Sequence, residues 1–343
     1  MKKVLITGIF GQDGAFLAKR LLSQGFRVFG LARRGGSIKS DRLRYFGILD
    51  DVEIKNSEII DFSSILKLLE EIKPDVIFNL AAQSFVQDSF INPWMTSNIN
   101  YFGVLNLYEA IRFLKLDCKV YQASTSEMYG KTIDDVQTEK SPFNPQSPYG
   151  ISKLAAHHLG VIYRETYKLK ISNGILFNHE SELRGREFVT RKITSQLVEV
   201  KNESRDFVLL GNLNAVRDWG YAADYVKAIE MMNFSEVNDD FVVATNNITS
   251  VREFFKKSAE LLDFKPIFSG NNAEEICTDK KTNKVIMKID KNYYRPLEVD
   301  YLRGDYSKIN STLGWKPETS VDEMIEKMVS FDLENYNKNI YFI

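Results

Sequence analysis

The chain has 343 residues, with 45 lysines and arginines, 46 aspartates and glutamates, and a formal net charge of −1. This length predicts one large domain or two closely joined domains, and 44% hydrophobic residues argue against disorder. The balanced charge argues against nucleic acid as a main partner. Two cysteines and three histidines show neither a disulfide framework nor a metal-like spacing. Because no apolar run reaches the roughly 20 residues of a membrane helix, we expect a soluble, cytoplasmic protein without a metal or a membrane partner.

The first half of the sequence alternates short apolar runs with helical patterns. Strands are predicted at residues 4–7, 27–32, 76–81 and 119–123, with the more charged 52–60 as a weaker candidate. Helices are predicted at residues 14–24, 63–72 and 98–113. This alternation predicts an α/β fold with a doubly wound parallel sheet covered by helices.

The second half is less regular. It predicts a helix at residues 148–167, strands at 170–177, 207–210 and 241–244, and helices at 250–262 and 320–335. Ser250 and Ser320 are the expected N-caps of the last two helices. We find no linker between the halves and expect them to pack closely.

A glycine-rich turn follows the first predicted strand and opens a helix. Gly8, Gly11 and Gly14 are spaced G-x-x-G-x-x-G. Gly8 permits a tight turn, Gly11 lets the backbone approach a pyrophosphate, and Gly14 allows close packing of helix and strand. The helix N-terminus then offers N–H groups to the anion. This arrangement predicts a Rossmann-type dinucleotide site.

The turn after the second predicted strand indicates which dinucleotide is bound. A site selective for NAD places Asp or Glu there to bind the ribose hydroxyls, whereas this sequence has Arg33 and Arg34. Two guanidinium groups without an acid suit a 2′-phosphate, so we expect NADP. Asp61 and Phe62, after the third predicted strand, are candidates for contact with the adenine, and Asp61 is equally a candidate helix cap.

A second group of residues suggests catalysis. Tyr149 and Lys153 are four residues apart on a predicted helix, so both side chains lie on one face. A nearby ammonium lowers the pKa of a tyrosine, so Tyr149 is a candidate general base on an alcohol, and Lys153 would also hold the nicotinamide ribose. The strand at 119–123 leads into Ser124-Thr125-Ser126-Glu127, at the sheet edge that faces the ligand. Glu127 is either a base for a carbon-bound proton or a helix-capping acid.

Several motifs resemble those of one known family. They read T-G-x-x-G-Q-D-G at 7–14, L-A-A-Q-S at 80–84, Q-A-S-T-S-E-M-Y-G at 122–130, S-P-Y-G-x-S-K at 147–153, N-G-I-L-F-N-H-E-S at 173–181, F-V-T-R-K-I at 188–193, R-D-W-G-Y-A-x-D-Y-V at 217–226 and Y-Y-R-P-x-E-V-D at 293–300. Together they resemble the GDP-mannose 4,6-dehydratases, within the extended short-chain dehydrogenase/reductase superfamily. The resemblance covers essentially the whole chain.

The resemblance implies a reaction scheme. Thr125 would hydrogen-bond the hydroxyl on sugar carbon 4, and Tyr149 would remove its proton while a hydride leaves for NADP. The ketone formed there acidifies the hydrogen on carbon 5. Glu127 would take that proton and protonate the departing hydroxyl on carbon 6, after which the hydride returns to carbon 6.

The resemblance also implies two sets of binding residues. Besides the glycines, the two arginines, Asp61 and Phe62, the cofactor set is Gln12, Asp13, Leu80, Ala81, Ala82, Ser84, Tyr149, Lys153, His179 and Arg184. The substrate set is Ser84, Ser126, Glu127, Asn178, Lys192, Arg217, Arg295 and Glu298. An NADP-binding Rossmann domain is expected over residues 1–177, with elements returning near 215–245. A smaller, mixed α/β domain over 178–343 would mainly bind the GDP-sugar.

Two stretches depart from the family pattern. Ser181-Glu182-Leu183-Arg184 stands where the family reads S-P-R-R, and Phe85 stands where the family has histidine. Both loops should border the sugar, so GDP-mannose and a GDP-D-glycero-D-manno-heptose both remain candidate substrates. The family's basic turn at 33–42 lies near a neighbouring subunit, which favours a homodimer or homotetramer.

Two other functions remain open from the sequence. A nucleotide-sugar epimerase or net oxidoreductase would use the same Tyr149 and Lys153 but would have no need of Glu127. A non-catalytic binding protein would keep the glycine turn and would have no need of the catalytic pair. The presence of Thr125, Glu127, Tyr149 and Lys153 together favours a 4,6-dehydratase, a hydro-lyase.

Overall fold

A seven-stranded parallel sheet forms the centre of the computed structural model, which describes residues 1–33, 40–294, 297 and 299–338. The strand order is β11-β6-β5-β4-β1-β2-β3. The bounds are β1 Lys3–Thr7, β2 Arg27–Ala32, β3 Glu53–Asn56, β4 Val76–Asn79, β5 Lys119–Thr125, β6 Lys170–Leu176 and β11 Asp240–Val243. The order reverses between β1 and β4, and a doubly wound sheet binds its ligand at the carboxyl ends of the strands near such a reversal.

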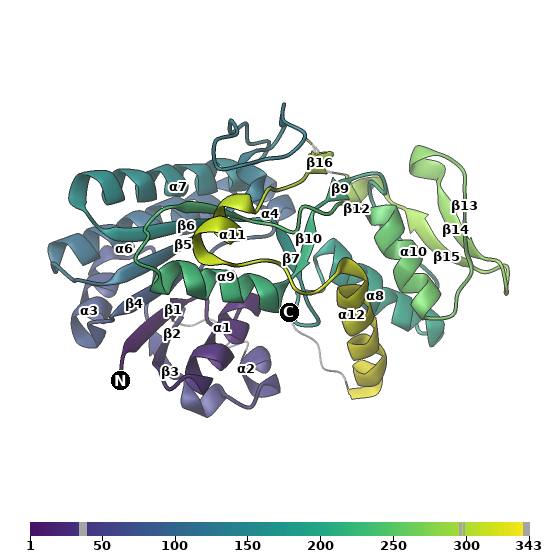
Figure 1. Cartoon of the computed structure of the whole chain (residues 1–343). Coiled ribbons are helices and arrows are strands. Elements are labelled where there is room, and N and C mark those ends of the chain that lie inside the picture. The colour runs from purple at the N-terminus through teal and green to yellow at the C-terminus, as the bar shows by residue number, and fades with distance from the viewer. Residues whose placement is uncertain (34–39, 295–296, 298, 339–343) are drawn as a thin grey trace.

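Helices cover both faces of this sheet (Figure 1). Val4 and Ile6 of β1 pack into the core that includes α1 (Gln12–Ser23) and α9 (Ala222–Phe234), whereas Leu5 packs into the core of α3 (Phe62–Ile72), α6 (Gly103–Phe113) and α7 (Pro148–Tyr167). Alternate residues of a strand point to opposite faces, so a strand buried on both sides reads as a continuous apolar run. The predicted fold class is therefore confirmed.

Smaller sheets and helices complete the described chain. The strands are β7 Asn178–Glu180, β8 Val208–Leu210, β9 Val216–Arg217, β10 Trp219–Tyr221, β12 Thr249–Ser250, β13 Pro266–Ser269, β14 Ile276–Asp279, β15 Val285–Ile289 and β16 Tyr301–Leu302. They form a β13-β14-β15-β8 sheet, a β12-β9-β16 sheet and a β10-β7 pair. The helices are α2 Asp41–Tyr45, α4 Val86–Ile91, α5 Pro93–Ser97, α8 Val189–Lys201, α10 Val251–Leu261, α11 Ser307–Leu313 and α12 Val321–Asn335. A third core joins α8, α10 and α12 to the four-stranded sheet.

Most predicted elements are present with shifted ends. The weak strand predicted at 52–60 is shorter in the structure, where it is β3. The strand predicted at 76–81 ends at Asn79, and Leu80 and Ala81 belong to the loop that lines the cavity. The helix predicted at 98–113 begins with a π-helical turn over Asn98–Phe102. The caps at Ser250 and Ser320 are confirmed, each forming a reciprocal capping box with the glutamate three residues on.

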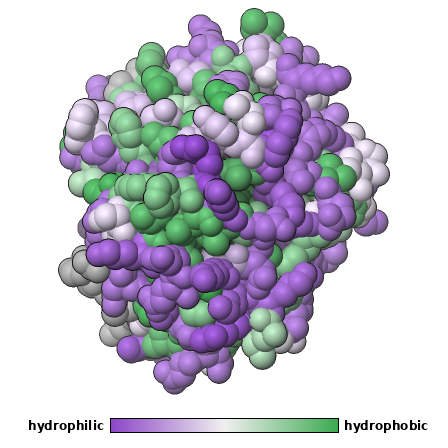
Figure 2. Space-filling model, turned by 90° about the vertical axis from the view of Figure 1, so that its left-hand side faces the viewer, coloured by the Kyte–Doolittle hydropathy of each residue, from purple (hydrophilic) through white to green (hydrophobic). Residues whose placement is uncertain are grey.

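The surface carries scattered apolar groups among hydrophilic ones. On the face shown in Figure 2, hydrophilic residues dominate and the hydrophobic ones gather near the middle. Within the described residues, no helix has the length and apolar character to cross a membrane.

Candidate active site

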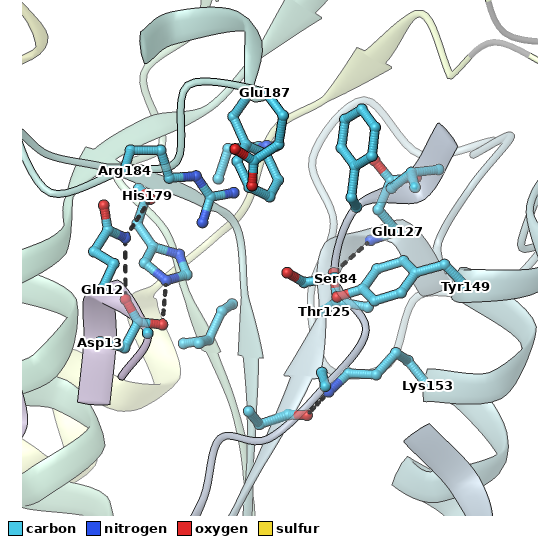
Figure 3. Close-up of a pocket in the computed structure, with 18 of the residues that line it drawn as sticks. Gln12, Asp13, Ser84, Thr125, Glu127, Tyr149, Lys153, His179, Arg184 and Glu187 are labelled. Carbon is cyan, nitrogen blue, oxygen red and sulfur yellow. Dashed lines mark hydrogen bonds and ion pairs between the residues drawn. The ribbon is translucent and has the colours of Figure 1, made fainter. Parts of the chain in front are cut away.

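A cavity of about 720 Å³ lies along the carboxyl ends of the central strands. Of the expected site residues, those that line it are Gly8, Gly11, Gln12, Asp13, Gly14, Arg33, Leu80, Ala81, Ala82, Ser84, Thr125, Ser126, Glu127, Tyr149, Lys153, Asn178, His179, Arg184, Lys192 and Arg217. Figure 3 shows the catalytic candidates on one side and the Asp13–His179–Arg184 group on the other. Motifs from both halves of the sequence therefore meet in one space.

The glycine turn has no room for side chains. Gly8 has a φ of +72°, and a Cβ on it would lie 2.9 Å from the backbone nitrogen of Ala81. A Cβ on Gly14 would lie 2.4 Å from the carbonyl oxygen of Gly8. Helix α1 begins without a side-chain cap, so the N–H groups of its first turn remain available to an anion. This cradle fits the pyrophosphate of a dinucleotide.

The Gly14 contact predicts a large effect of one methyl group. We expect Gly14→Ala to weaken dinucleotide binding at least tenfold and to destabilise the protein by about 1–3 kcal/mol, because the contact is with backbone atoms that cannot move aside. Gly25→Ala is the control, since its Cβ would meet no atom within 4 Å and would only strain a positive φ. Urea denaturation and a fluorescence titration with NADP would measure both. Equal loss of affinity in the two variants would contradict the packing argument.

The loop after β4 is held over the turn by Thr7. The Thr7 hydroxyl accepts hydrogen bonds from the backbone N–H groups of Leu80 at 3.1 Å and Ala81 at 3.0 Å, and it donates to Asn79 at 2.6 Å. Thr7 is buried and does not line the cavity. It therefore fixes the floor of the dinucleotide site from behind.

The catalytic candidates come from two adjoining elements. Thr125 ends β5, and Glu127 lies in the short helix η3 (Ser126–Met128). Tyr149 and Lys153 lie one turn apart on α7. Gly150 makes the approach of the two elements possible, because a Cβ there would lie 2.8 Å from the carbonyl oxygen of Glu127. All four catalytic candidates are less than 10% exposed.

The electrostatics of this group differ from expectation. Burial raises the pKa of Tyr149 to about 12, assisted by the charge of Glu127 and opposed by a hydrogen bond with Thr125. Burial also lowers the pKa of Lys153 to about 8, and its ammonium donates to the carbonyl of Ala123. The prediction that Lys153 lowers the pKa of Tyr149 is therefore wrong for this state of the site, because desolvation of the phenolate outweighs any attraction.

An ion pair joins α1 to β7 at the opposite wall. His179 donates through Nδ1 to the carbonyl of Phe177 at 2.7 Å, and its Nε2 lies 2.9 Å from Oδ2 of Asp13. Because a carbonyl and a carboxylate only accept, both ring nitrogens carry protons. The ring stacks on Tyr225, with centroids 4.8 Å apart. Gln12 donates to both Asp13 and the carbonyl of His179, which fixes the pair.

This pair predicts a pH dependence of stability. Burial raises the pKa of Asp13, but the charge and hydrogen bonds of its partners outweigh burial and lower it to about 2. Burial lowers the pKa of His179, but the charge and hydrogen bond of Asp13 raise it above 6.5. The Asp13 contribution is therefore present above the ordinary pKa of 3.8 and lost as the pH falls toward 2. The His179 contribution is present below 6.5 and lost as the pH rises through the higher folded value.

We therefore expect the free energy of unfolding of the wild type to fall as the pH rises from 6.5 through the higher folded pKa of His179, and to fall less in His179→Asn. Urea denaturation at several pH values would measure the difference. The control is His158→Asn, whose side chain is exposed on α7. A pH profile of His179→Asn that matches the wild type would show that the ion pair does not contribute.

Cationic groups gather on the side of the cavity formed by later elements. Arg184 pairs with Glu180 at 3.1 Å, and its guanidinium lies 3.6 Å from the centre of the Phe188 ring. Lys192 lies 3.3 Å above the ring of Tyr293, and burial lowers its pKa to about 8. These cations are placed to meet the phosphates of a nucleotide.

At the adenine end of the predicted site, the structure shows Asp61 as the helix cap that the sequence also allowed. Asp61 and Phe62 do not line the cavity: Asp61 caps α3 by accepting from the N–H groups of Ser63 and Ser64. Because β3 ends at Asn56, residues 57–60 form the loop that crosses the sheet edge, and these line the cavity instead. Arg33 lines the cavity. Arg34, Arg295 and Glu298 lie outside the described residues.

Further lining residues escaped the sequence analysis. Phe85 and Phe188 pack edge to face across the cavity wall, with centroids 5.7 Å apart, and Glu187, Trp219 and Tyr293 also line it. Aromatic residues are frequent in cores, so their types gave no signal. The motifs at 188–193, 217–226 and 293–300 contain three of these aromatic residues, but the motifs did not indicate that they line the cavity.

Comparisons with known proteins agree with this geometry. A profile of the family described as GDP-mannose 4,6 dehydratase matches residues 5–328. The GDP-mannose 4,6 dehydratase of Cricetulus griseus is 42% identical over 346 residues, covering 98% of this chain and 93% of the relative. The GDP-mannose 4,6-dehydratase of Vibrio cholerae is 43% identical over 352 residues, covering 97% and 94%.

Solved structures share the fold at lower identity. DesIV, a dTDP-glucose 4,6-dehydratase from Streptomyces venezuelae with NAD and TYD bound, superimposes with a TM-score of 0.82 at 20% identity over 98% of both chains. RMD from Pseudomonas aeruginosa, complexed with NADPH, gives a TM-score of 0.75 at 19% identity over 97% of this chain and all of the other.

The parallel sheet, the glycine turn and the Tyr149–Lys153 pair define an enzyme of the short-chain dehydrogenase/reductase type, a class that uses a nicotinamide dinucleotide. The match of the family profile over residues 5–328 then identifies the family within this class. The chain belongs to the GDP-mannose 4,6-dehydratase family, and it is a hydro-lyase rather than an epimerase or a net oxidoreductase.

Proposed function

We propose that the protein removes water from a GDP-linked manno-configured sugar and releases the 4-keto-6-deoxy sugar. One observation carries the proposal: the carboxyl group of Glu127 lies in the same buried cluster as Thr125 and Tyr149, close enough to influence the pKa of Tyr149. A simple dehydrogenase needs only the tyrosine and the lysine, whereas a dehydration needs a further base and acid.

Tyr149 and Thr125 are suited to the first step. Both side chains line the cavity and lie close enough for Thr125 to lower the pKa of Tyr149, so a sugar hydroxyl beside them would contact both an acceptor and a donor. Tyr149 takes the proton from the hydroxyl on carbon 4. When bound, the nicotinamide would accept the hydride from carbon 4 and later return it to carbon 6.

Glu127 is suited to the elimination. Once carbon 4 is a ketone, the proton on carbon 5 is acidic enough for a carboxylate to remove. Glu127 takes it and gives a proton to the hydroxyl leaving carbon 6, which departs as water. The proton that Tyr149 took from the carbon 4 hydroxyl balances the proton that carbon 5 takes up at the end. Because the hydride that leaves carbon 4 comes back at carbon 6, the reaction has no net redox change.

We propose NADP as the dinucleotide. Arg33 lines the cavity directly after β2, where an acid would bind the ribose hydroxyls of NAD. RMD from Pseudomonas aeruginosa, which has the same fold, was solved with NADPH. The test is titration of the protein with NADP and with NAD. We expect Arg33→Ala to lose affinity for NADP at least tenfold and to leave the affinity for NAD unchanged; equal losses would contradict recognition of a 2′-phosphate.

The sugar is tested by a direct comparison. The protein would be incubated with GDP-mannose and with GDP-D-glycero-D-manno-heptose in parallel, and loss of water would be followed by mass. Phe85 lines the cavity beside Phe188, whereas Leu183 is fully buried and lies outside the lining. Of the two departures from the family pattern, Phe85 is therefore the one placed to influence the sugar. Failure to dehydrate either substrate would contradict the proposed function.

We propose that residues 1–177, with elements returning near 215–245, bind the dinucleotide and that residues 178–343 mainly bind the GDP-sugar.

We also propose that the protein forms a homo-oligomer. Helices α4, α5 and α7 pack against one another, and they expose Ile91, Trp94, Ile151 and Ile162, each by more than half. Large apolar groups on one set of elements support self-association. Light scattering would measure the oligomer. The expected cytoplasmic location stays a prediction.

A further inference from the structure

A buried carboxylate next to Arg217 is tied to two loops at once. Asp218 is completely buried and directly follows Arg217, which lines the cavity. Its Oδ1 accepts from the N–H of Thr245 at 2.8 Å and from the hydroxyl of Thr245 at 2.7 Å. Its Oδ2 accepts from the N–H of Asn246 at 2.8 Å and from the N–H of Gly304 at 3.2 Å. Four donors therefore converge on one side chain.

These donors come from different parts of the fold. Thr245 and Asn246 follow β11, the edge strand of the central sheet, whereas Gly304 follows β16. Strand β16 pairs with β9, the strand that carries Arg217. The N–H of Asp218 also donates to the carbonyl of Leu302 at 3.1 Å. The carboxylate thus fastens the strand pair β9–β16 to the end of the central sheet.

The same segment is fastened to the catalytic side. Gln137 is completely buried in the connection between η3 and α7, which carry Glu127 and Tyr149. Its backbone N–H donates to the carbonyl of Arg303 at 2.8 Å, and its Oε1 accepts from the N–H of Arg303 at 2.9 Å. Residues next to Gly304 are therefore held by Gln137 from one side and by Asp218 from the other.

We infer that Asp218 is a positioning residue that holds Arg217 in place for the diphosphate of the nucleotide-sugar. The inference rests on the proposed function, because Arg217 lines the cavity that is proposed to hold the GDP-sugar. A buried donor left without a partner costs free energy, so the loops would move if the acceptor were lost. Strand β9, which carries Arg217, would move with these loops. The glycine turn and α7 supply none of the four hydrogen bonds to Asp218, so they should stay in place.

The experiment is Asp218→Asn in the full-length enzyme. The amide keeps the shape but replaces one acceptor oxygen with a donor, so at least one N–H loses its partner. We expect KM for the GDP-sugar to rise about ten- to hundredfold, because a displaced Arg217 would lose its charge-assisted contact with the diphosphate. We expect kcat to change less than about threefold and the affinity for NADP to stay the same.

Two further variants separate positioning from stability. Asp224→Asn is the matched control, since Asp224 is a buried carboxylate that accepts from the N–H groups of Glu318 and Thr319 and does not line the cavity. It should lower Tm without raising KM. Thr245→Val removes one donor and leaves the three backbone donors, so it should raise KM a few-fold and remain folded if Asp218→Asn does not.

The outcomes distinguish this inference from the proposed function. A wild-type KM in folded Asp218→Asn, or in Thr245→Val if Asp218→Asn does not fold, would overturn the inference, as would an equal rise of KM in Asp224→Asn. If the wild type dehydrated no GDP-sugar, the proposed function would fail, and calorimetric binding of GDP to the same variants would still test the inference. Weaker GDP binding in Asp218→Asn and Thr245→Val, but not in Asp224→Asn, would support it.

Discussion

Replacing Glu127 with Gln is expected to stop the reaction after the oxidation of carbon 4. Glutamine has nearly the same shape but is not a base, so the proton on carbon 5 would stay in place and water would not leave. General acid–base groups contribute about 10²–10⁴-fold to rate, and we expect formation of the keto-deoxy sugar to fall within that range. The position of Glu127 in η3, buried beside Thr125 and Tyr149, is the physical basis.

Two measurements would check the Glu127→Gln result. In deuterated water the wild type should incorporate deuterium at carbon 5, and the variant should not. Absorbance of reduced nicotinamide should rise in the variant when substrate is added, because the hydride has no acceptor to return to. Glu58→Gln is the control, since Glu58 lines the same cavity after β3, far from α7 in the fold. A wild-type rate in Glu127→Gln would refute the role of Glu127.

Replacing Tyr149 with Phe is expected to block the earlier step. The hydroxyl on carbon 4 would keep its proton, so neither reduced nicotinamide nor product should form, with a loss of about 10²–10⁴-fold. Because burial raises the pKa of Tyr149 to about 12 in the described site, wild-type activity should increase with pH through the neutral range until another group limits it. A rate profile from pH 6 to 9 would measure this increase.

The control for Tyr149→Phe lies on the same helix. Tyr163 of α7 donates its hydroxyl to Glu109 at 2.6 Å and does not line the cavity. We expect Tyr163→Phe to lose some stability and to keep kcat within about twofold. The two catalytic variants should also differ from each other, since only Glu127→Gln allows reduced nicotinamide to accumulate. Accumulation in both would mean that Tyr149 is not the base.

Local patterns predicted most of the catalytic half of the site. The glycine spacing at 8–14 and the pair Tyr149–Lys153 depend on contacts within a few residues, and the cavity contains both. Asp61 and Phe62, predicted to contact the adenine, lie just beyond the lining residues 57–60, because β3 ends at Asn56, where its pairing with β2 stops. Apolarity along the chain did not show where that pairing stops.

The sequence by itself determined the doubly wound sheet, the phosphate-binding turn and the residue types available for dehydration, because strand burial, helix spacing and glycine geometry are local properties. Only the tertiary structure decided that Asp13 pairs with His179 and that Asp218 anchors the strand of Arg217. It also decided that burial raises the pKa of Tyr149, which Lys153 was expected to lower. These features depend on residues 27 to 166 positions apart and on how much water each group loses, and a linear sequence specifies neither directly.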